Sequence, residues 1–223
     1  MKKALFIDYM GSLATEDNQY IQEVVRRAYI GSRAQSPHEL AAAWFQIQEE
    51  LLRESYGESY RLEHDIALEA FRRLKEQFGV RERAQTLLEL LERHWWQSPM
   101  YGDVKEFMEK CPLPIYIVTN NDNKYLEEGM KANGLESYPA GIITSEMARA
   151  YKPRPEIFKM ALERSGCEPE EVIHIGDSLT VDVAGAKAVG IEPWLLNRKN
   201  QAVEAGLRSF SSLYKVLDAL PRI

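Results

Sequence analysis

Five short apolar runs, separated by helical patterns, constrain the fold of this chain more than any other feature. The runs cover residues 2–8, 114–119, 140–144, 171–176 and 191–196. Each run is too short for a stable helix, and most are nearly continuous in apolar residues, as expected for parallel strands covered on both faces. Between the later four runs lie helical patterns with clear ends, such as Pro155 opening one helix and Gly190 ending another. We therefore predict an α/β fold with a doubly wound, Rossmann-like parallel sheet.

The long stretch between the first two expected strands lacks this alternation. It has the apolar spacing of four amphipathic helices and no convincing strand. One helix start is well defined, because Ser36 can cap it, Pro37 suits the first turn and Glu39 can complete a capping box. We predict that these helices form an all-helical cap over the carboxyl ends of the strands. The expected domains are a core of residues 1–15 and 99–223 and a cap of residues 16–98.

Composition argues against several classes of protein. The 223 residues carry a formal net charge of -6. An acidic protein repels the phosphates of nucleic acid, so the charge argues against a nucleic-acid partner. No run approaches the roughly 18 apolar residues of a membrane span, so we expect no membrane partner. Cys111 and Cys167 stand far apart outside any CxxC pattern, which argues against a disulfide framework and a zinc site. We expect a cytoplasmic protein, and the sequence does not indicate its oligomeric state.

Three aspartates stand where ligands bind in such a fold, outside the carboxyl ends of the strands. Asp8 ends the first apolar run, and Asp177 and Asp182 follow the fourth. Taken singly, Asp8 could be a turn residue and Asp182 a helix cap. Gathered at one sheet edge, however, the carboxylates would repel one another unless a cation neutralised them, and hard oxygen ligands suit Mg²⁺. We predict that they hold a divalent metal beside a carboxylate nucleophile.

Two further residues at this edge are candidates for binding a substrate. Thr119 ends the second apolar run, and its hydroxyl could satisfy backbone groups or bind a transferring phosphoryl group. Lys152 precedes a helix start made rigid by proline, where it could hold negative charge on Asp8 and on the substrate. The glycine-containing turn after Asp8 could also point backbone N–H groups at an anion.

Taken together, these segments resemble the four motifs of the haloacid dehalogenase-like hydrolase superfamily in order and spacing. The resemblance covers nearly the whole chain, because the helical insertion resembles the cap of the phosphoglycolate phosphatase and beta-phosphoglucomutase branch. Two motifs are especially close to that branch, namely Lys152-Pro-x-Pro-x-Ile-Phe158 and Gly176-Asp177-x4-Asp182.

The resemblance implies a role for each candidate residue. Asp8 would be the nucleophile that forms a covalent aspartyl intermediate, Mg²⁺ the cofactor and a small phosphorylated metabolite the substrate. The implied metal site consists of Asp8, Asp177 and the carbonyl of Met10, with Asp182 supporting it from behind. The implied substrate contacts come from Gly11, Ser12, Thr119 and Asn120, and Lys152 would stabilise charge.

Met10 departs from this pattern. Phosphatases of the superfamily carry an aspartate at this position, which serves as general acid and base. A thioether cannot exchange protons at neutral pH, and the loss of a positioned acid and base costs roughly 10² to 10⁴-fold in rate. The chain could still be a phosphatase that is slow, takes its acid from His38, His64 or His94 of the cap, or acts on leaving groups that need little protonation, such as those of acyl phosphates.

Two alternatives to a phosphatase stay open at this stage. A haloacid dehalogenase or phosphonatase also lacks the aspartate, but dehalogenases depart from the Gly-Asp-x4-Asp pattern kept here. Phosphonatase needs an early cap lysine, whereas Lys75 is the cap's only lysine and lies late in a helix. A binding or regulatory protein could keep the pocket without turnover, although it has no reason to retain all the charged motif residues. The sequence therefore favours a Mg²⁺-dependent phosphatase.

Overall fold

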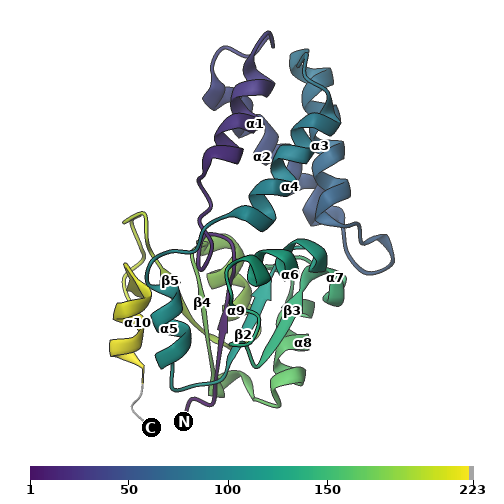
Figure 1. The fold of residues 1–223 in the computed structure, drawn as a ribbon. Coiled ribbons are helices and arrows are strands. Elements are labelled where there is room, and N and C mark those ends of the chain that lie inside the picture. The colour runs from purple at the N-terminus through teal and green to yellow at the C-terminus, as the bar shows by residue number, and fades with distance from the viewer. Residues whose placement is uncertain (221–223) are drawn as a thin grey trace.

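The computed structural model describes residues 1–220, which contain a six-stranded sheet in the order β3-β2-β1-β4-β5-β6. Every neighbouring pair of strands is parallel. The strands are β1 (Ala4–Ile7), β2 (Ile115–Thr119), β3 (Gly141–Thr144), β4 (Val172–Gly176), β5 (Glu192–Leu196) and β6 (Arg208–Phe210). Their carboxyl ends face the four helices drawn at the top of Figure 1.

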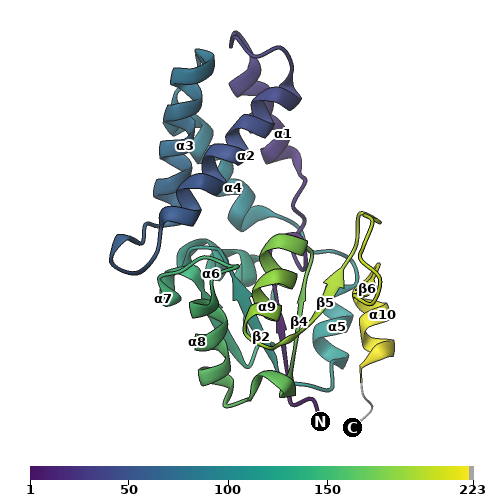
Figure 2. The same ribbon diagram turned by 180° about the vertical axis from the view of Figure 1, so that it is seen from behind.

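Helices cover both faces of the sheet. In β1, Leu5 and Ile7 belong to one buried cluster, whereas Ala4 and Phe6 belong to another on the opposite face, as the alternation of a strand requires. Figures 1 and 2 show the corresponding helices on the two sides. The first cluster includes residues of α5 (Val104–Lys110), α6 (Asn123–Ala132) and α10 (Leu213–Ala219), and the second residues of α8 (Pro155–Ser165) and α9 (Ala184–Ala188). The predicted doubly wound α/β fold is thus confirmed.

Some short elements escaped prediction. Strand β6 has three residues and begins with Arg208 and Ser209; an edge strand pairs on one side only and needs no continuous apolar run. Helices α5 and α10 have seven residues each, and the four-residue α7 (Ser145–Ala148) is shorter still. An apolar pattern of one or two turns is too brief to identify a helix by periodicity.

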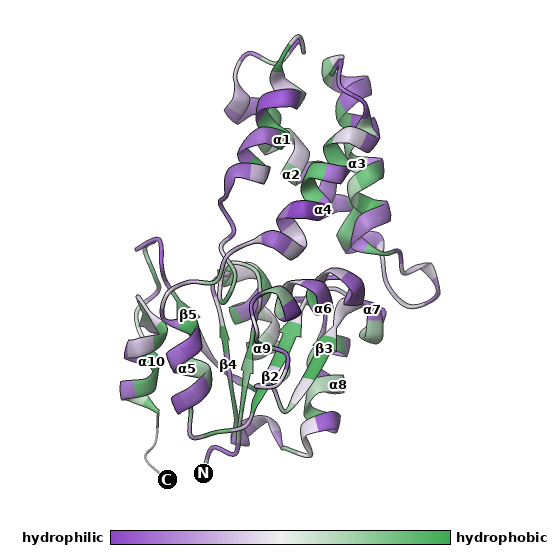
Figure 3. Ribbon diagram, viewed as in Figure 1, coloured by the Kyte–Doolittle hydropathy of each residue, from purple (hydrophilic) through white to green (hydrophobic). Residues whose placement is uncertain are grey.

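Four longer helices, α1 to α4, pack together beyond the carboxyl edge of the sheet. They are α1 (Gln19–Tyr29), α2 (Pro37–Glu54), α3 (Glu63–Phe78) and α4 (Ala84–Gln97). Figure 3 shows apolar segments on these helices, and their buried side chains form a cluster around Trp44 and Phe71. The Ser36 hydroxyl accepts a hydrogen bond from the N–H of Glu39 at 3.1 Å, as the capping box predicts, but the Glu39 carboxylate accepts from Gln35.

Two connections join these helices to the sheet, and they run side by side. The N–H of Thr15 donates to Pro99 at 2.9 Å, and the N–H of Tyr101 donates to Leu13 at 3.0 Å. The chain therefore enters and leaves the four helices at one place, next to the turn that follows β1. Within residues 1–220, no helix has both the length and the apolar character needed to cross a membrane.

Candidate active site

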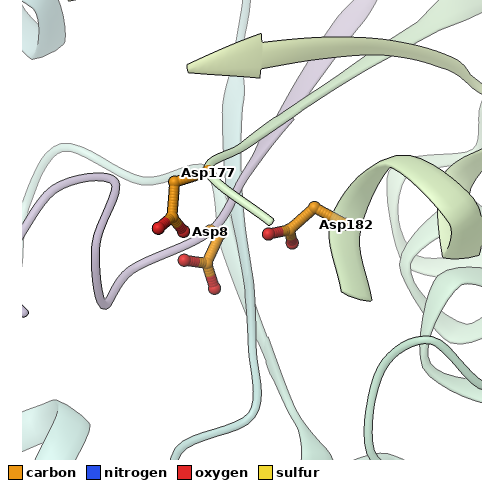
Figure 4. A group of neighbouring side chains, drawn as sticks. All are labelled: Asp8, Asp177 and Asp182. Carbon is orange, nitrogen blue, oxygen red and sulfur yellow. The ribbon is translucent and has the colours of Figure 1, made fainter. Parts of the chain in front are cut away.

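Three carboxylates meet at the carboxyl edge of the sheet (Figure 4). Asp8 follows β1 and Asp177 follows β4, and these neighbouring strands pair in register through Ile7 and Ile175. Asp182 lies on a π-helical turn that precedes α9. One oxygen of each carboxylate lies within 4.8 Å of the others. The structure thus brings together the three aspartates that the sequence places at this edge.

Two glycines make room for these carboxylates. A methyl group on Gly176 would lie 2.1 Å from Cγ of Asp182, and one on Gly11 would lie 2.5 Å from Oδ2 of Asp177. Gly11 also has a φ of 84°, a conformation that favours glycine. Both positions therefore need glycine for the aspartates to approach one another.

Lys152 is the cation of this cluster. Its ammonium is buried and lies 2.6 Å from Oδ1 of Asp8 and 2.6 Å from Oδ1 of Asp182. Its backbone is held by the Asn120 side chain, which accepts a hydrogen bond from the Lys152 N–H at 2.7 Å and donates one to the Lys152 carbonyl at 3.2 Å. Asn120 therefore positions the lysine.

Lys152 pairs with two of the three carboxylates, and the pKa values of the three aspartates differ accordingly. Burial raises the pKa of Asp8 to about 7, with Asp182 adding to the rise and Lys152 opposing it. Burial, Asp8 and Asp182 raise the pKa of Asp177 to about 8. Burial opposes ionisation of Asp182 too, but Lys152 and His174 outweigh it and keep its pKa below the usual range.

This distribution of charge fits a divalent cation. Within residues 1–220, no lysine or arginine forms an ion pair with Asp177. Asp182, by contrast, accepts hydrogen bonds from Lys152, from His174 at 3.0 Å and from the N–H of Ser178 at 3.2 Å. The carboxylates of Asp8 and Asp177 are therefore the better direct ligands for a hard ion such as Mg²⁺, with Asp182 behind them.

A cavity of about 530 Å³ opens in front of the carboxylates. The strand-end segments contribute Asp8, Met10, Thr119, Asn120, Asn121, Lys152, Asp177, Ser178, Val181, Asp182 and Lys199 to its wall. The segment from Glu16 to Trp95 contributes Glu16, Asp17, Ile21, Trp44, Phe45, Gln48, Glu63, Leu91, His94 and Trp95. The cavity thus lies between the sheet edge and the four helices.

Two of the four predicted substrate-binding residues border the cavity, and two do not. Thr119 and Asn120 border the cavity, and the Thr119 hydroxyl donates to Oδ1 of Asn121 at 2.7 Å. Gly11 and Ser12 are not among the bordering residues, because the turn after β1 folds back on itself. The Gly11 N–H donates to Ala14 at 2.8 Å, and the buried Ser12 hydroxyl has no hydrogen-bond partner among residues 1–220. Substrate contacts from Gly11 and Ser12 therefore stay a prediction.

The three cap histidines also differ in position. His94 borders the cavity, whereas His38 does not and His64 lines a separate pocket. Nδ1 of His94 lies 2.9 Å from the Asn18 amide nitrogen, which makes Nδ1 the acceptor. Burial lowers the pKa of His94 to about 4, so the ring is neutral at pH 7. His94 is therefore poorly suited to act as an acid.

Sequence reasoning missed two titratable residues near the site. His174 is the one histidine in the otherwise apolar strand β4. A buried histidine in such a strand is unusual, and this could have indicated a role at the site. Glu63 borders the cavity from the start of α3, and its buried Oε2 has no hydrogen-bond partner in the described part of the chain. Burial, together with Asp122 and Asp8, raises the pKa of Glu63 well above its usual range. Glu63 stands among many acidic residues of the helical segment, so the sequence did not distinguish it as a buried residue of the cavity.

A contact between the helices and the sheet edge lies beside Glu63. The Asp122 carboxylate accepts hydrogen bonds from the N–H groups of Glu63 at 2.9 Å and His64 at 3.0 Å. Asp122 comes shortly after β2, so a residue distant in sequence caps α3. The first N–H groups of a helix have no partner within the helix. In α3 two of them bond to Asp122, and these hydrogen bonds hold the helices against the strand ends.

Comparison with known proteins places the chain in a family. The family model of the haloacid dehalogenase-like hydrolases matches residues 2–190. Haloacid dehalogenase-like hydrolase domain-containing protein 3 from Danio rerio is 41% identical over 104 residues, which cover 45% of this chain and 43% of the relative. The chain spans about half the length of the curated relatives it matches.

Two solved structures match over almost the full length of both chains. A HAD phosphatase from Thermococcus onnurineus is 27% identical, covers 98% of this chain and 97% of its own, and has a TM-score of 0.68. The L-2-haloacid dehalogenase from Xanthobacter autotrophicus has a TM-score of 0.80 and covers 98% of each chain, but at 21% identity it shares the fold alone. The family match over most of the sequence confirms the resemblance, and the chain belongs to the haloacid dehalogenase-like hydrolases.

Proposed function

We propose that this protein is a Mg²⁺-dependent phosphatase for a small phosphorylated metabolite, with Asp8 as the nucleophile. The supporting observation is the buried Asp8 carboxylate, held 2.6 Å from Lys152 and grouped with Asp177 at the wall of a cavity. The full-length similarity to a HAD phosphatase adds support. In this proposal residues 16–98 form the cap, residues 1–15 and 99–223 form the core, and the protein acts in the cytoplasm.

Each charged residue has a part in this reaction. Asp8, Asp177 and the backbone carbonyl of Met10 would hold Mg²⁺, which when bound neutralises charge on the phosphoryl group. Asp8 attacks phosphorus and the bond to the leaving group breaks, which leaves a phosphoryl group on the Asp8 carboxylate. Lys152 neutralises negative charge at Asp8, and Thr119 would bind a phosphoryl oxygen. Water then releases phosphate and restores the Asp8 carboxylate.

Turnover tests this proposal directly. We expect hydrolysis within a panel of 4-nitrophenyl phosphate, acetyl phosphate and phosphorylated metabolites, and we expect EDTA to abolish it. If no phosphate ester or anhydride is hydrolysed in a manner that needs both Mg²⁺ and Asp8, the proposal is wrong. The protein would then be one that binds phosphate or metal without turnover.

Metal binding can be measured without turnover, by thermal unfolding with and without Mg²⁺. Without metal, Asp8 and Asp177 keep their protons up to pH values of about 7 and about 8 in the folded chain, above the unfolded values. Their stabilising contribution is full at low pH and is lost as the pH rises through these values. Mg²⁺ binds the ionised groups, so its Kd rises as the pH falls. A fixed Mg²⁺ concentration of 100 times the Kd at pH 8.5 should therefore raise Tm by about 5 °C or more near pH 8.5 and by less near pH 5.5.

Two variants control the metal measurement. Asp177→Asn should lose the Mg²⁺-dependent rise, whereas Asp65→Asn, which changes an exposed cap aspartate outside the cavity, should keep it. A rise of equal size at both pH values, or a rise that survives in Asp177→Asn, would show that Mg²⁺ binds elsewhere.

Closure of the cap should depend on the carboxylate of Asp122. Replacing an N-cap residue by alanine costs about 0.5–2 kcal/mol. Asp122 belongs to the core and caps a helix of the cap domain, so this cost falls on the arrangement in which the cap packs against the strand ends. We expect Asp122→Ala to lower kcat/KM by about 2- to 30-fold. Ser36→Ala removes the cap of α2 within the helical bundle and should lower Tm without this loss of kcat/KM. Equal kcat/KM in the two variants would contradict a role of Asp122 in closure.

A further inference from the structure

The cap side of the cavity has an aromatic wall. Ile21, Trp44, Phe45, Leu91 and Trp95 all border it. The Trp44 and Phe45 rings stack with their centroids 5.0 Å apart and their planes 20° apart. Phe45 is 55% exposed although it is a large apolar residue. An exposed aromatic side chain at the wall of a cavity is typical of a surface that receives an apolar ligand.

The same wall offers no positive charge to a ligand. Among the described residues that border the cavity, the cap contributes the acids Glu16, Asp17 and Glu63 but no lysine or arginine. The two bordering lysines come from the strand-end side. Lys152 is enclosed by two aspartates of the site, and Lys199 pairs with Glu16 at 2.5 Å. A carboxylate or second phosphate on the leaving group would therefore find no cation on the cap wall.

The residue at position 10 restricts the leaving group in a second, independent way. Met10 borders the cavity but has no proton to give to the departing oxygen. His94 is neutral and accepts a hydrogen bond at Nδ1. An alkoxide resembles hydroxide, whose conjugate acid has a pKa of about 15.7, and departs slowly without an acid. A phenolate, with a conjugate-acid pKa of about 10, departs far more readily.

We propose that the cap wall is a subsite for an uncharged aromatic leaving group, so that the substrates are phosphate monoesters of neutral phenols. This inference rests on the proposed phosphatase function. The Asp8 carboxylate forms a bond to phosphorus while the bond from phosphorus to the phenolic oxygen breaks. The phenolate leaves with that electron pair and takes a proton from solvent. Water then attacks phosphorus, the bond to Asp8 breaks, and inorganic phosphate is released with loss of a proton to solvent.

The charge requirement is tested with two esters of similar size, 4-carbamoylphenyl phosphate and 4-carboxyphenyl phosphate. We expect kcat/KM to be at least about tenfold higher for the uncharged carbamoyl ester. Phe45→Lys places a cation on the wall and should narrow this ratio at least about threefold. Ile30→Lys is the matched control, because Ile30 is 54% exposed on the same group of helices but lies outside the cavity, and it should leave the ratio unchanged.

The leaving-group requirement is tested with phenyl phosphates of graded acidity and with cyclohexyl phosphate, which has a similar shape. We expect cyclohexyl phosphate to be hydrolysed at least about 10²-fold more slowly than phenyl phosphate, the cost of a missing general acid. Glu63→Gln should retain this difference. If Glu63 instead supplied the proton, the wild type would hydrolyse both esters at similar rates and Glu63→Gln would lose the cyclohexyl activity alone.

The outcomes separate this inference from the proposed function. Efficient hydrolysis of carboxylated or alkyl phosphates, or a ratio that Phe45→Lys does not change, overturns the aromatic subsite and leaves the phosphatase in place. If no phosphate ester is hydrolysed in an Mg²⁺- and Asp8-dependent manner, the phosphatase and the subsite both fail.

Discussion

Asp8→Asn is expected to lower kcat/KM for phosphate ester hydrolysis by about 10⁴-fold or more, because the amide keeps the size of the side chain but lacks the charge that attacks phosphorus. The measurement is steady-state hydrolysis of 4-nitrophenyl phosphate in saturating Mg²⁺. The variant should remain folded. Burial already raises the pKa of Asp8 to about 7, and Lys152 keeps Asp182 as its partner, so a neutral side chain there should leave Tm in EDTA unchanged or higher.

The unfolding measurement distinguishes loss of chemistry from loss of fold. If Asp8→Asn retains more than about a tenth of the activity, Asp8 is not the nucleophile. If it loses activity together with a large drop in Tm in EDTA, Asp8 acts mainly as a structural partner of Lys152. Asp177→Asn is the companion variant, since it weakens the metal site and spares the nucleophile.

Met10→Asp is expected to raise kcat by about 10² to 10⁴-fold, because it supplies the proton donor and acceptor that the thioether cannot. Met10 borders the cavity and is only partly buried, so the shorter carboxylate has room and access to solvent. The gain should be largest for substrates with poor leaving groups, such as alkyl phosphates. The measurement is kcat across alkyl and aryl esters at one pH.

Met10→Asn is the matched control for this gain. Asparagine has the shape of aspartate but transfers no proton at neutral pH, so it should not increase kcat. Equal rates in the two variants would show that position 10 affects the reaction through size alone. If Met10→Asp hydrolyses phosphate esters while the wild type does not, the natural protein is better described as a binding protein that retains the pocket.

The parts of the fold and site that follow local sequence patterns could be predicted. The five main strands were predictable because parallel strands covered on both faces leave continuous apolar runs. Asp8, Asp177 and Asp182 were predictable because each follows such a run, and the parallel sheet then carries the strand ends to one edge.

Residues whose roles depend on tertiary contacts could not be assigned in this way. Asn120 was predicted to bind substrate; it borders the cavity, and its amide also holds the backbone of Lys152, a contact that its sequence position did not indicate. Gly11 and Ser12 follow the nucleophile in sequence, but the turn after β1 folds back on itself and neither is among the residues that border the cavity. The Asp122 cap on α3 joins residues about 60 positions apart, and no local pattern encodes such a contact.

The central claim is that Asp8 forms a covalent phosphoryl intermediate, and rapid-quench mass spectrometry tests it most directly. Met10 provides no base for the hydrolytic water, so the intermediate should accumulate when the wild type is mixed with an aryl phosphate and Mg²⁺. We predict that the chain gains the mass of one phosphoryl group, that peptide mapping places it on Asp8, and that EDTA prevents it. Turnover without this adduct, an adduct on another residue, or metal-independent alkylation of Asp8 by a 2-haloacid with release of halide would contradict this mechanism.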